Sequence, residues 1–258
     1  MKALITGASS GLGWDMAHIL SKMGYDIIAV ARRTERLELL KKSLNTSVEI
    51  VCCDVSDVEQ CKGLARYASS VDILINNAGF GVFGDLCSTD LDAELKMLDT
   101  NTRAMHILTK LFVKEFKKRN SGHILNVASI AAFFPGPLFA AYYASKSYVL
   151  RLTESLAEEL RQEKSNVLVS VLCPGPVHTE FENVAGVSFG TGKEPMRKGM
   201  ILESKSVAEY AIKKMLSGKL VIIPGKLMKI AAFMRHLVSD KMLAKILYFI
   251  QSKKMESK

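Results

Sequence analysis

Tyr142 and Lys146 stand four positions apart in a segment whose apolar residues have helical spacing. Residues at i and i+4 share one face of a helix, so we expect these two side chains to lie together. A phenol ordinarily ionises near pH 10 and is a poor acid–base group at neutral pH. A neighbouring ammonium group favours the phenolate and lowers the pKa of the tyrosine. The spacing therefore predicts a tyrosine that exchanges a proton, and Tyr143, three positions before Lys146, is the competing candidate.

A second group of residues suited to chemistry is the glycine-rich stretch TGASSGLG, residues 6–13, which follows an apolar run. Gly7, Gly11 and Gly13 supply the backbone freedom for a tight turn or for a close approach of a ligand. The N–H groups and the dipole at the start of a helix favour an anion. A strand, a glycine turn and a helix in this order are typical of a dinucleotide pyrophosphate site. The simpler alternative is a turn with a helix cap.

These side chains need a scaffold, and the chain alternates strand-like and helix-like segments. We expect strands at Lys2–Thr6, Asp26–Ala31, Val48–Cys52, Val71–Ile75, Gly122–Val127, Val167–Leu172 and Leu220–Ile223. We expect helices near 12–23, 34–44, 57–68, 90–119, 141–164 and 204–216. This alternation predicts a parallel α/β sheet with helices on both faces, and right-handed crossovers make it a doubly wound, Rossmann-type, three-layer fold. The whole chain, 1–258, is interpreted as one domain, with a lid at about 182–203 and a basic amphipathic tail at about 225–258.

The charge of the chain is concentrated in its C-terminal part. The chain has 258 residues, 48% of them hydrophobic, and a formal net charge of +9. The stretch 219–258 contains nine basic and two acidic residues, but its charges alternate with apolar residues, which argues against nucleic-acid binding. The five cysteines show no metal-ligand spacing and are typical of reduced thiols. The first residues enter a strand at once and leave no room for a signal peptide, so we expect a cytoplasmic protein.

Further motifs follow the later strands in a fixed order. They are Asn76-Asn77-Ala78-Gly79, then Asn101, then Ser129, then Tyr142-x-x-x-Lys146, and finally Pro174-Gly175-Pro176-Val177-His178-Thr179. With these motifs the chain resembles the short-chain dehydrogenase/reductase family over essentially its whole length. The segments CPGPVHTEF and IIPGKLMKI resemble a bacterial group of this family with varied or unassigned substrates.

The resemblance implies the roles of four catalytic residues. Tyr142 is the general acid that protonates a carbonyl oxygen, and Ser129 hydrogen-bonds the same oxygen. Lys146 also holds the ribose hydroxyls of the nicotinamide, and Asn101 supports Lys146 through a water. The expected reaction is hydride transfer between nicotinamide and a carbonyl or secondary alcohol. The alternatives are a fatty acyl or ketoacyl reductase of the same family and a non-catalytic NADP(H)-sensing protein.

Ala31-Arg32-Arg33 stands where an enzyme specific for NAD usually carries an acid. An arginine there can donate charge-assisted hydrogen bonds to a 2′-phosphate, so NADP(H) is favoured over NAD(H). Arg32 is the better candidate because it is nearer the strand end. Asp54 resembles the family's adenine contact, although it could instead cap a helix together with Ser56 and Asp57. The full set of expected cofactor residues is Gly7, Ser9, Ser10, Gly11, Leu12, Gly13, Arg32, Arg33, Asp54, Val55, Asn77, Ala78, Gly79, Tyr142, Lys146, Pro174, Gly175, Val177 and Thr179.

The substrate pocket is expected to be apolar. Its expected lining residues are Phe133, Phe134, Pro135, Pro137, Phe181, Val187 and Phe189. The tail shows helical spacing over 227–250, with lysines between its apolar residues. We favour a subunit interface or a lid over the substrate site for it, ahead of an ordinary solvated helix pair, and a peripheral membrane contact is less favoured. The resemblance also implies a homodimer or homotetramer.

Overall fold

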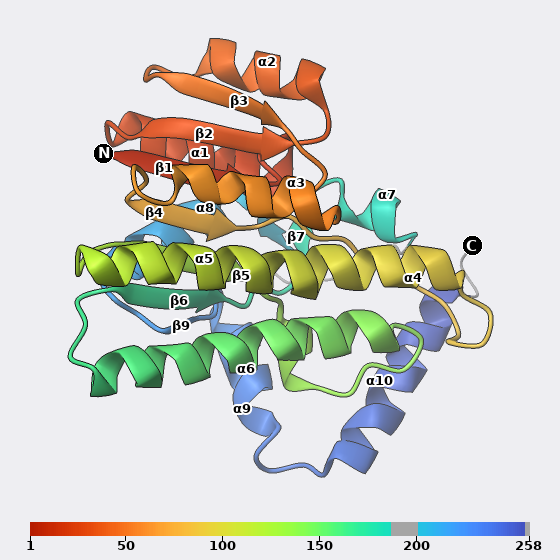
Figure 1. The fold of residues 1–258 in the computed structure, drawn as a ribbon. Helices are drawn as coiled ribbons and strands as arrows, with labels where there is room; N and C mark the ends of the chain where they lie inside the picture. The colour runs from red at the N-terminus through yellow and green to blue at the C-terminus, as the bar shows by residue number, and fades with distance from the viewer. Residues whose placement is uncertain (187–200, 256–258) are drawn as a thin grey trace.

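A parallel sheet of seven strands forms the centre of the computed structural model, which describes residues 1–186 and 201–255 (Figure 1). The strands are β1 (Lys2–Thr6), β2 (Asp26–Ala31), β3 (Val48–Cys52), β4 (Ile73–Asn76), β5 (His123–Val127), β6 (Leu168–Leu172) and β9 (Val221–Ile222). Their order across the sheet is β3-β2-β1-β4-β5-β6-β9, and all neighbours are parallel. The chain reverses its direction of travel between β1 and β4, which opens a crevice at the carboxyl edge. The predicted doubly wound sheet is confirmed.

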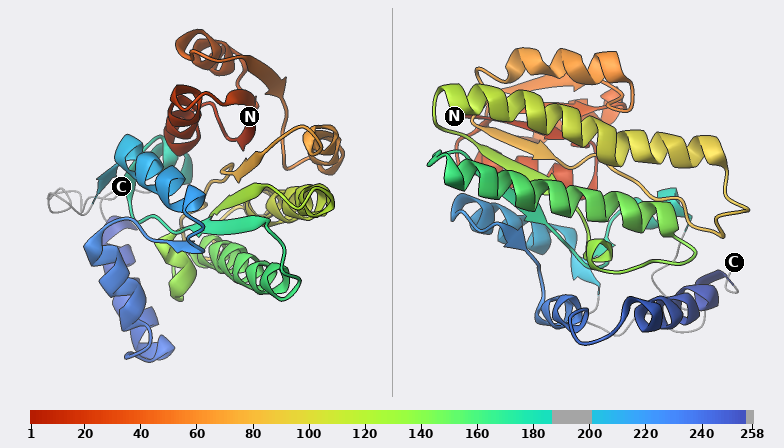
Figure 2. Two further views of the ribbon diagram at one scale, coloured as in Figure 1. Left: turned by 90° about the vertical axis from the view of Figure 1, so that its left-hand side faces the viewer. Right: turned by 60° about the horizontal axis from the view of Figure 1, so that its bottom comes forward.

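Helices cover both faces of this sheet, as the two views in Figure 2 show. α1 (Gly11–Lys22), α2 (Thr34–Ser43) and α8 (Ser204–Leu216) pack on the face to which Ile5 of β1 points. α3 (Val58–Gly63), α5 (Met105–Lys118) and α6 (Ala140–Gln162) pack on the opposite face, with Leu4 of β1. Because both faces are buried, the strands are nearly continuous apolar runs, and this is why the sequence predicts them well.

The helical stretch expected over 90–119 is interrupted. It consists of α4 (Leu91–Leu98), a wider π-helical turn (Asp99–Ala104) and α5. Asp90 begins the stretch, because its side chain accepts a hydrogen bond from the backbone N–H of Ala93 at 2.7 Å. The π-helical turn contains Asn101, whose side chain is buried. Such turns are local insertions that re-aim side chains, so this one places Asn101 inside the fold.

Short elements continue from the carboxyl edge of the sheet. The turn after β5 is a 3-10 helix (Ile130–Phe133), and another (Leu64–Tyr67) follows α3, where we expected one helix over 57–68. After β6 come β7 (Val177–His178), α7 (Phe181–Ala185) and β8 (Leu202–Glu203), with β7 and β8 paired in parallel. The expected lid, 182–203, is thus described only at its two ends. Its residues Val187 and Phe189 lie outside the described part of the chain.

The tail forms two helices, α9 (Lys226–Met234) and α10 (Asp240–Met255), within the stretch whose apolar residues have helical spacing, 227–250. They follow one another along the lower edge of the molecule in Figure 1. Met228 of α9 contacts Gly175, because a Cβ on that glycine would come within 2.6 Å of the methionine sulfur. Within residues 1–186 and 201–255, no helix is long and apolar enough to cross a membrane, and no cluster of potential metal ligands is found.

Candidate functional site

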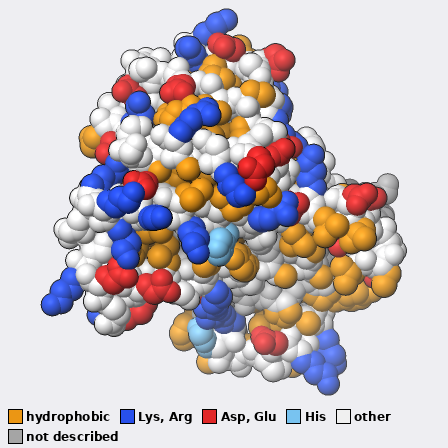
Figure 3. Space-filling view, viewed as in Figure 1, with side chains coloured by type: hydrophobic (Ala, Val, Ile, Leu, Met, Phe, Trp, Pro, Cys, Tyr) orange, Lys and Arg blue, Asp and Glu red, His pale blue; other side chains and the backbone are white. Residues whose placement is uncertain are grey.

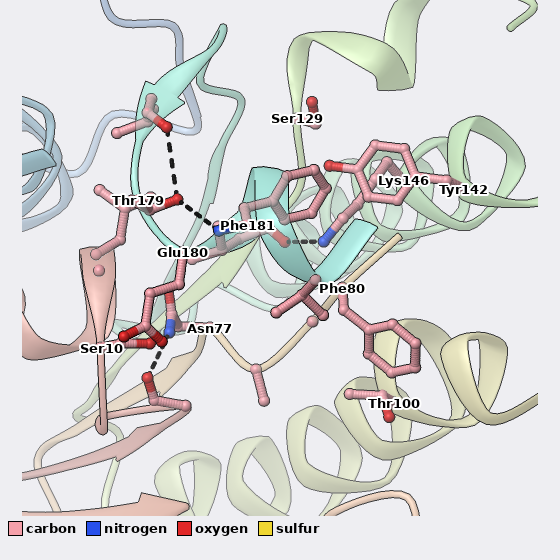
Figure 4. A pocket seen from close by; sticks show the side chains of 18 of the residues that line it. Ser10, Asn77, Phe80, Thr100, Ser129, Tyr142, Lys146, Thr179, Glu180 and Phe181 are labelled. Carbon is pink, nitrogen blue, oxygen red and sulfur yellow. Dashed lines mark hydrogen bonds between the residues drawn. The ribbon is translucent and has the colours of Figure 1, made fainter. Parts of the chain in front are cut away.

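A cleft of about 660 Å³ opens at the carboxyl edge of the sheet (Figure 4). Residues that follow each of the strands β1 to β6 line it, together with parts of α6, α7 and α10. All the expected cofactor residues are on this lining except Gly13. Of the four expected catalytic residues, Ser129, Tyr142 and Lys146 line the cleft, whereas Asn101 lies behind it. One cleft therefore collects residues that are up to about 240 positions apart in the chain.

The glycine turn after β1 adopts a backbone that other residues resist. Gly7 has φ +67° and Gly11 has φ +53°. A Cβ on Gly13 would come within 2.4 Å of the Gly7 carbonyl oxygen, so Gly13 allows the first turn of α1 to pack against β1. The side-chain amide of Asn77 donates to the carbonyl oxygens of Thr6 and Gly7 at 3.0 and 3.2 Å. Gly13 thus shapes the turn from behind instead of facing the cleft, which corrects its expected place among the contact residues.

The two arginines after β2 have different surroundings. The guanidinium of Arg33 donates to the hydroxyls of Ser9 and Ser10 at 3.1 and 2.9 Å, and it pairs with the Glu180 carboxylate at 2.8 Å. Arg32 makes one long ion pair with Asp54 at 3.8 Å, and its side chain is 62% exposed. Because the donors of Arg33 already have partners, Arg32 has more of its hydrogen-bonding capacity available to a new anion.

Asp54 does not cap the helix that follows it. Asp57 does so, by accepting hydrogen bonds from the backbone N–H groups of Glu59 and Gln60. Asp54 instead lies on the cleft lining and accepts from the backbone and hydroxyl of Ser56 at 3.1 and 2.7 Å. Burial acts to raise the pKa of Asp54, but the hydrogen bonds from Ser56 and the nearby cations hold it below its usual value. The carboxylate is therefore ionised and turned to the adenosine end of the expected cofactor site.

Tyr142 lies in the first turn of α6 and is 8% exposed. Its ring stacks on that of Phe139, with 4.4 Å between the centroids. In Figure 4 its hydroxyl points toward Ser129. Burial raises the pKa of Tyr142, and a hydrogen bond with Ser129 opposes this. We expected Lys146 to lower this pKa, and that expectation is wrong for this structure, where loss of hydration outweighs it.

Lys146 is 4% exposed and lies one helical turn after Tyr142. Its ammonium group donates to the carbonyl oxygen of Val127 at 3.1 Å and lies 5.7 Å from the centroid of the Tyr142 ring. Burial lowers the pKa of Lys146 to about 8. Loss of hydration therefore leaves this lysine poised to exchange a proton near neutral pH.

Asn101 connects the loop after β4 with helix α6. Its side chain accepts from the Phe80 N–H at 3.1 Å and donates to the Phe80 carbonyl oxygen at 2.9 Å. It also donates to the Ser145 hydroxyl at 3.1 Å, and that hydroxyl donates to the carbonyl oxygen of Tyr142. A Cβ on Gly79 would meet both the Asn101 oxygen and the Lys146 nitrogen, at 2.8 and 3.2 Å. Asn101 and Lys146 are therefore neighbours on either side of this glycine.

Gln251 of α10 also lines the cleft, and sequence reasoning missed it. It is 3% exposed, and its side-chain NH₂ donates to the Tyr143 hydroxyl at 3.2 Å. Its carbonyl oxygen is buried without a hydrogen-bond partner. Tyr143 thus lines the cleft, and its ring also packs against the core cluster that contains Met97 and Phe139. One signal was available, because Gln251 is the polar member of the otherwise apolar stripe Leu243, Leu247 and Gln251, spaced i, i+4, i+8.

The expected apolar lining is only partly correct. Phe181 lines the cleft, but Phe133, Phe134 and Pro135 line a separate hollow with Arg235 and His236, and Pro137 lines neither. The 3-10 turn after Ser129 carries these residues away from the cleft toward α9. Phe80 and Phe139 take their place beside Tyr142.

A sequence profile described as short chain dehydrogenase matches residues 1–186, which is more than half of the chain. Farnesol dehydrogenase from Aedes aegypti is 37% identical over 222 residues, covering 81% of this chain and 87% of that protein. The protein therefore belongs to the short-chain dehydrogenase family.

Solved structures agree with this assignment. A short-chain dehydrogenase from Sphingobium yanoikuyae in complex with NADPH is 26% identical, with a TM-score of 0.79, and the match covers 93% of this chain and 95% of that one. A short-chain dehydrogenase/reductase from Burkholderia phymatum in complex with NAD is 26% identical, with a TM-score of 0.82 and 92% coverage of both chains. Structures of this fold thus hold nicotinamide cofactors of both kinds.

Proposed function

We propose that the protein is an NADP(H)-dependent oxidoreductase that transfers a hydride between nicotinamide and a carbonyl compound or secondary alcohol. The observation that carries this proposal is that Ser129, Tyr142 and Lys146 line the same cleft as the glycine turn. A proton donor and a dinucleotide cradle in one cleft are what a carbonyl reductase needs. The bacterial branch suggested by the sequence motifs is part of the same proposal.

The cleft fits a nicotinamide dinucleotide on the chain's own geometry. The turn at Gly7 and Gly11, with the first N–H groups of α1 behind it, forms a cradle that a Cβ would obstruct. Asp54 and Val55 lie beside it, where an adenine would be placed. Asn77, Ala78, Gly79 and the loop at Pro174–Thr179 extend the cradle toward Lys146. When bound, NADPH supplies the hydride.

The preference for NADP(H) rests on charge. Arg32 lies at the mouth of the cleft, and Ala31 leaves the end of β2 without a carboxylate. A 2′-phosphate can therefore take charge-assisted hydrogen bonds from Arg32 without meeting a like charge at that position. Glu180 acts against the binding of a 2′-phosphate, because its carboxylate is negatively charged and already forms an ion pair with Arg33.

The proton steps follow from the burial of Tyr142 and Lys146. Tyr142 remains a phenol at neutral pH because burial raises its pKa, so it is ready to donate its proton to a carbonyl oxygen in reduction. Ser129 donates a second hydrogen bond to that oxygen and polarises it. Lys146, whose pKa is lowered to about 8, stabilises the phenolate that forms and returns a proton to it, with Asn101 holding the water of the relay.

The proposed substrate is a small, mainly apolar carbonyl compound or alcohol. Phe80, Phe139 and Phe181 supply apolar walls next to Tyr142. The similarity to a farnesol dehydrogenase supports an apolar alcohol. Gln251 and Tyr143 offer the polar contact at this end of the cleft. A fatty acyl or ketoacyl reductase is the alternative enzyme, and a cofactor-sensing protein without turnover is the alternative outside catalysis.

The wider organisation is proposed on the sequence motifs and the family. Residues 1–258 form a single nicotinamide-binding domain in the cytoplasm, with the lid at about 182–203 and the tail at about 225–258. It assembles as a homodimer or homotetramer.

Turnover tests this function directly. Oxidation of NADPH and of NADH is followed with a panel of aliphatic, terpenoid and aromatic aldehydes and ketones. We expect NADPH-dependent reduction that falls by roughly 10²- to 10⁴-fold in Tyr142→Phe, which loses only the acid. The matched control is Tyr143→Phe, which keeps the acid and retains turnover. If Tyr142→Phe stays active while Tyr143→Phe is inactive, the assignment is wrong. NADPH binding without any turnover would favour the sensing protein.

A further inference from the structure

The two tail helices expose an unusual amount of apolar surface. On α10, Met242, Ile246, Phe249 and Ile250 are between 46% and 61% exposed. They are spaced i, i+4, i+7 and i+8, which places them on one side of the helix. This side is distinct from the stripe Leu243, Leu247 and Gln251 that packs inward. α10 is therefore apolar on two sides, and the protein's own core accounts for only one of them.

α9 and the turn after it repeat this pattern. Ile230, Phe233, Met234 and Leu237 are between 40% and 67% exposed. More than half of the strongly exposed large apolar side chains of the described residues lie between Leu227 and Ile250. Exposed apolar side chains concentrated in one part of the chain mark an interaction site, because their contact with water is costly. We call these eight residues of α9, the turn and α10, with the exposed lysines beside them, the tail face.

The inner side of the tail is fixed to the body. Lys229 donates to the Tyr210 hydroxyl at 3.3 Å, and the Arg235 guanidinium lies over the Phe133 ring at 5.3 Å. Gln251 donates to Tyr143 at 3.2 Å. These contacts hold α9 and α10 in place, so the tail face is presented outward on a formed structure and needs no rearrangement to meet a partner.

The tail face is also strongly basic. Residues 226–253 contain six basic residues and one acidic residue, Asp240. Lys226, Lys241, Lys245 and Lys253 are exposed among the apolar side chains. In Figure 3 hydrophobic side chains gather at the lower right of the molecule, where Figure 1 places α10, and basic side chains lie along its lower edge. The partner must therefore bury apolar groups and carry negative charge.

We propose that the tail face docks on the surface of an anionic lipid bilayer, with the apolar side chains in the headgroup region and the lysines on the lipid phosphates. Helices with an apolar side flanked by lysines bind membranes in this way. A second copy of the chain fits less well. In a two-fold dimer the same face meets itself, so two surfaces of net positive charge come together and repel each other.

This docking places the substrate end of the cleft near the lipid. Gln251, on the inward side of α10, lines the cleft, while Phe249 and Ile250 beside it belong to the tail face. A membrane-bound protein would thus hold the mouth of its cleft within about one helix diameter, on the order of 10 Å, of an apolar phase. The docking itself does not depend on the proposed enzymatic function.

Vesicle flotation tests the proposal with the full chain. The probes are vesicles of phosphatidylcholine and phosphatidylserine at 7:3 and vesicles of phosphatidylcholine alone. We expect co-flotation with the anionic vesicles that falls at high salt, and little with the neutral ones. Each lysine near an anionic surface contributes roughly fivefold, so replacing Lys241, Lys245 and Lys253 with Glu lowers partitioning on the order of 100-fold or more.

Matched variants separate docking from general effects of charge. Replacement of the exposed Lys110, Lys114 and Lys213 with Glu changes the net charge by the same amount as the tail-face triple. We expect it to reduce vesicle binding less than that triple does. Phe233→Ser with Phe249→Ser removes apolar contact and is expected to lower partitioning at least tenfold, with an unchanged circular dichroism spectrum. Absence of flotation, equal flotation with neutral vesicles, or equal loss in both lysine triples would overturn the proposal. A different result would also overturn it: the wild-type protein does not bind vesicles, and the variant with Phe233→Ser and Phe249→Ser dissociates into smaller species. That result would show that the tail face is a subunit interface.

Discussion

The two ends of the cleft are built in different ways. The glycine-turn end consists of Gly7, Gly11, Arg32, Arg33 and Asp54, each just past the end of one of the first three strands. The tyrosine end consists of Phe80, Phe139, Tyr142, Tyr143 and Gln251, which come from a loop, one long helix and the tail. The first end depends on backbone shape at strand ends. The second depends on how distant segments pack. Variants that perturb one end of the cleft and spare the other test this distinction.

The largest effect is expected at Gly13. A Cβ there would lie 2.4 Å from the backbone oxygen of Gly7, which cannot move without disturbing β1. Gly13→Ala is expected to lower the free energy of unfolding by about 3 kcal/mol and to abolish NADPH binding. The matched control is Gly63→Ala, because nothing lies within 4 Å of its Cβ and its backbone is helical. Alanine there should be neutral or stabilise by about 0.5 kcal/mol. Chemical denaturation measures both, and equal effects would contradict the close approach.

The next effect concerns Arg32 at the same end. A charge-assisted hydrogen bond contributes about 1.5–3 kcal/mol, so Arg32→Ala should weaken NADPH binding roughly 10- to 150-fold and change NADH binding little. Adding Ala31→Asp should reverse the preference, since a carboxylate repels the phosphate and accepts from a ribose hydroxyl. The exposed Arg161→Ala is the control. Isothermal titration with both cofactors decides this, and equal or tighter binding of NADH to the wild-type protein would refute the NADP assignment.

Lys146 provides a pH-dependent test at the tyrosine end. Its folded-state pKa of about 8 is below the usual 10.5, so the unfolded chain binds the proton more tightly. This penalty is present in full below pH 8 and is relieved as pH rises toward 10.5. Between pH 7 and pH 9.5 the wild-type protein should therefore gain about 2 kcal/mol of stability relative to Lys146→Met. Urea unfolding at the two pH values measures the difference, with Lys110→Met as an exposed control. A constant difference would show that Lys146 is not perturbed by burial.

The smallest effect is expected at Gln251. Gln251 lines the cleft, and its buried carbonyl oxygen has no hydrogen-bond partner among the described residues, so we expect a polar group on the substrate to become that partner. Gln251→Leu keeps the size and removes the amide. We expect KM for the best ketone of the panel to rise about 2- to 10-fold, with NADPH affinity unchanged. Gln162→Leu, on an exposed part of α6, is the control. A change in NADPH affinity with no change in KM for the ketone would contradict the prediction that Gln251 contacts the substrate.

The same distinction explains what could be predicted from the sequence. All seven strands of the sheet were expected within two residues of their bounds, because strands buried on both faces carry an unbroken apolar signal. Ser129, Tyr142 and Lys146 were expected in one site because each follows from a motif next to a strand end or on a helix face. The stripe on α10 marks Gln251 as a polar residue on an apolar side, but its contact with Tyr143 was not predictable, since it depends on how α10 folds back. The pKa of Tyr142 was predicted in the wrong direction, because local spacing says nothing of burial.

The π-helical turn at Asp99–Ala104 has a consequence for which insertions and deletions this chain can tolerate. Each residue turns an α-helix by about 100°. Deleting one residue from the turn would let α4 and α5 join as one regular helix. Either Asn101 would then rotate off Phe80 and Ser145, or Phe112 and Phe116 would rotate out of the core. Among functional relatives, changes in length should therefore gather in the exposed part of the loop before α4, at residues 85–88, and avoid residues 99–104.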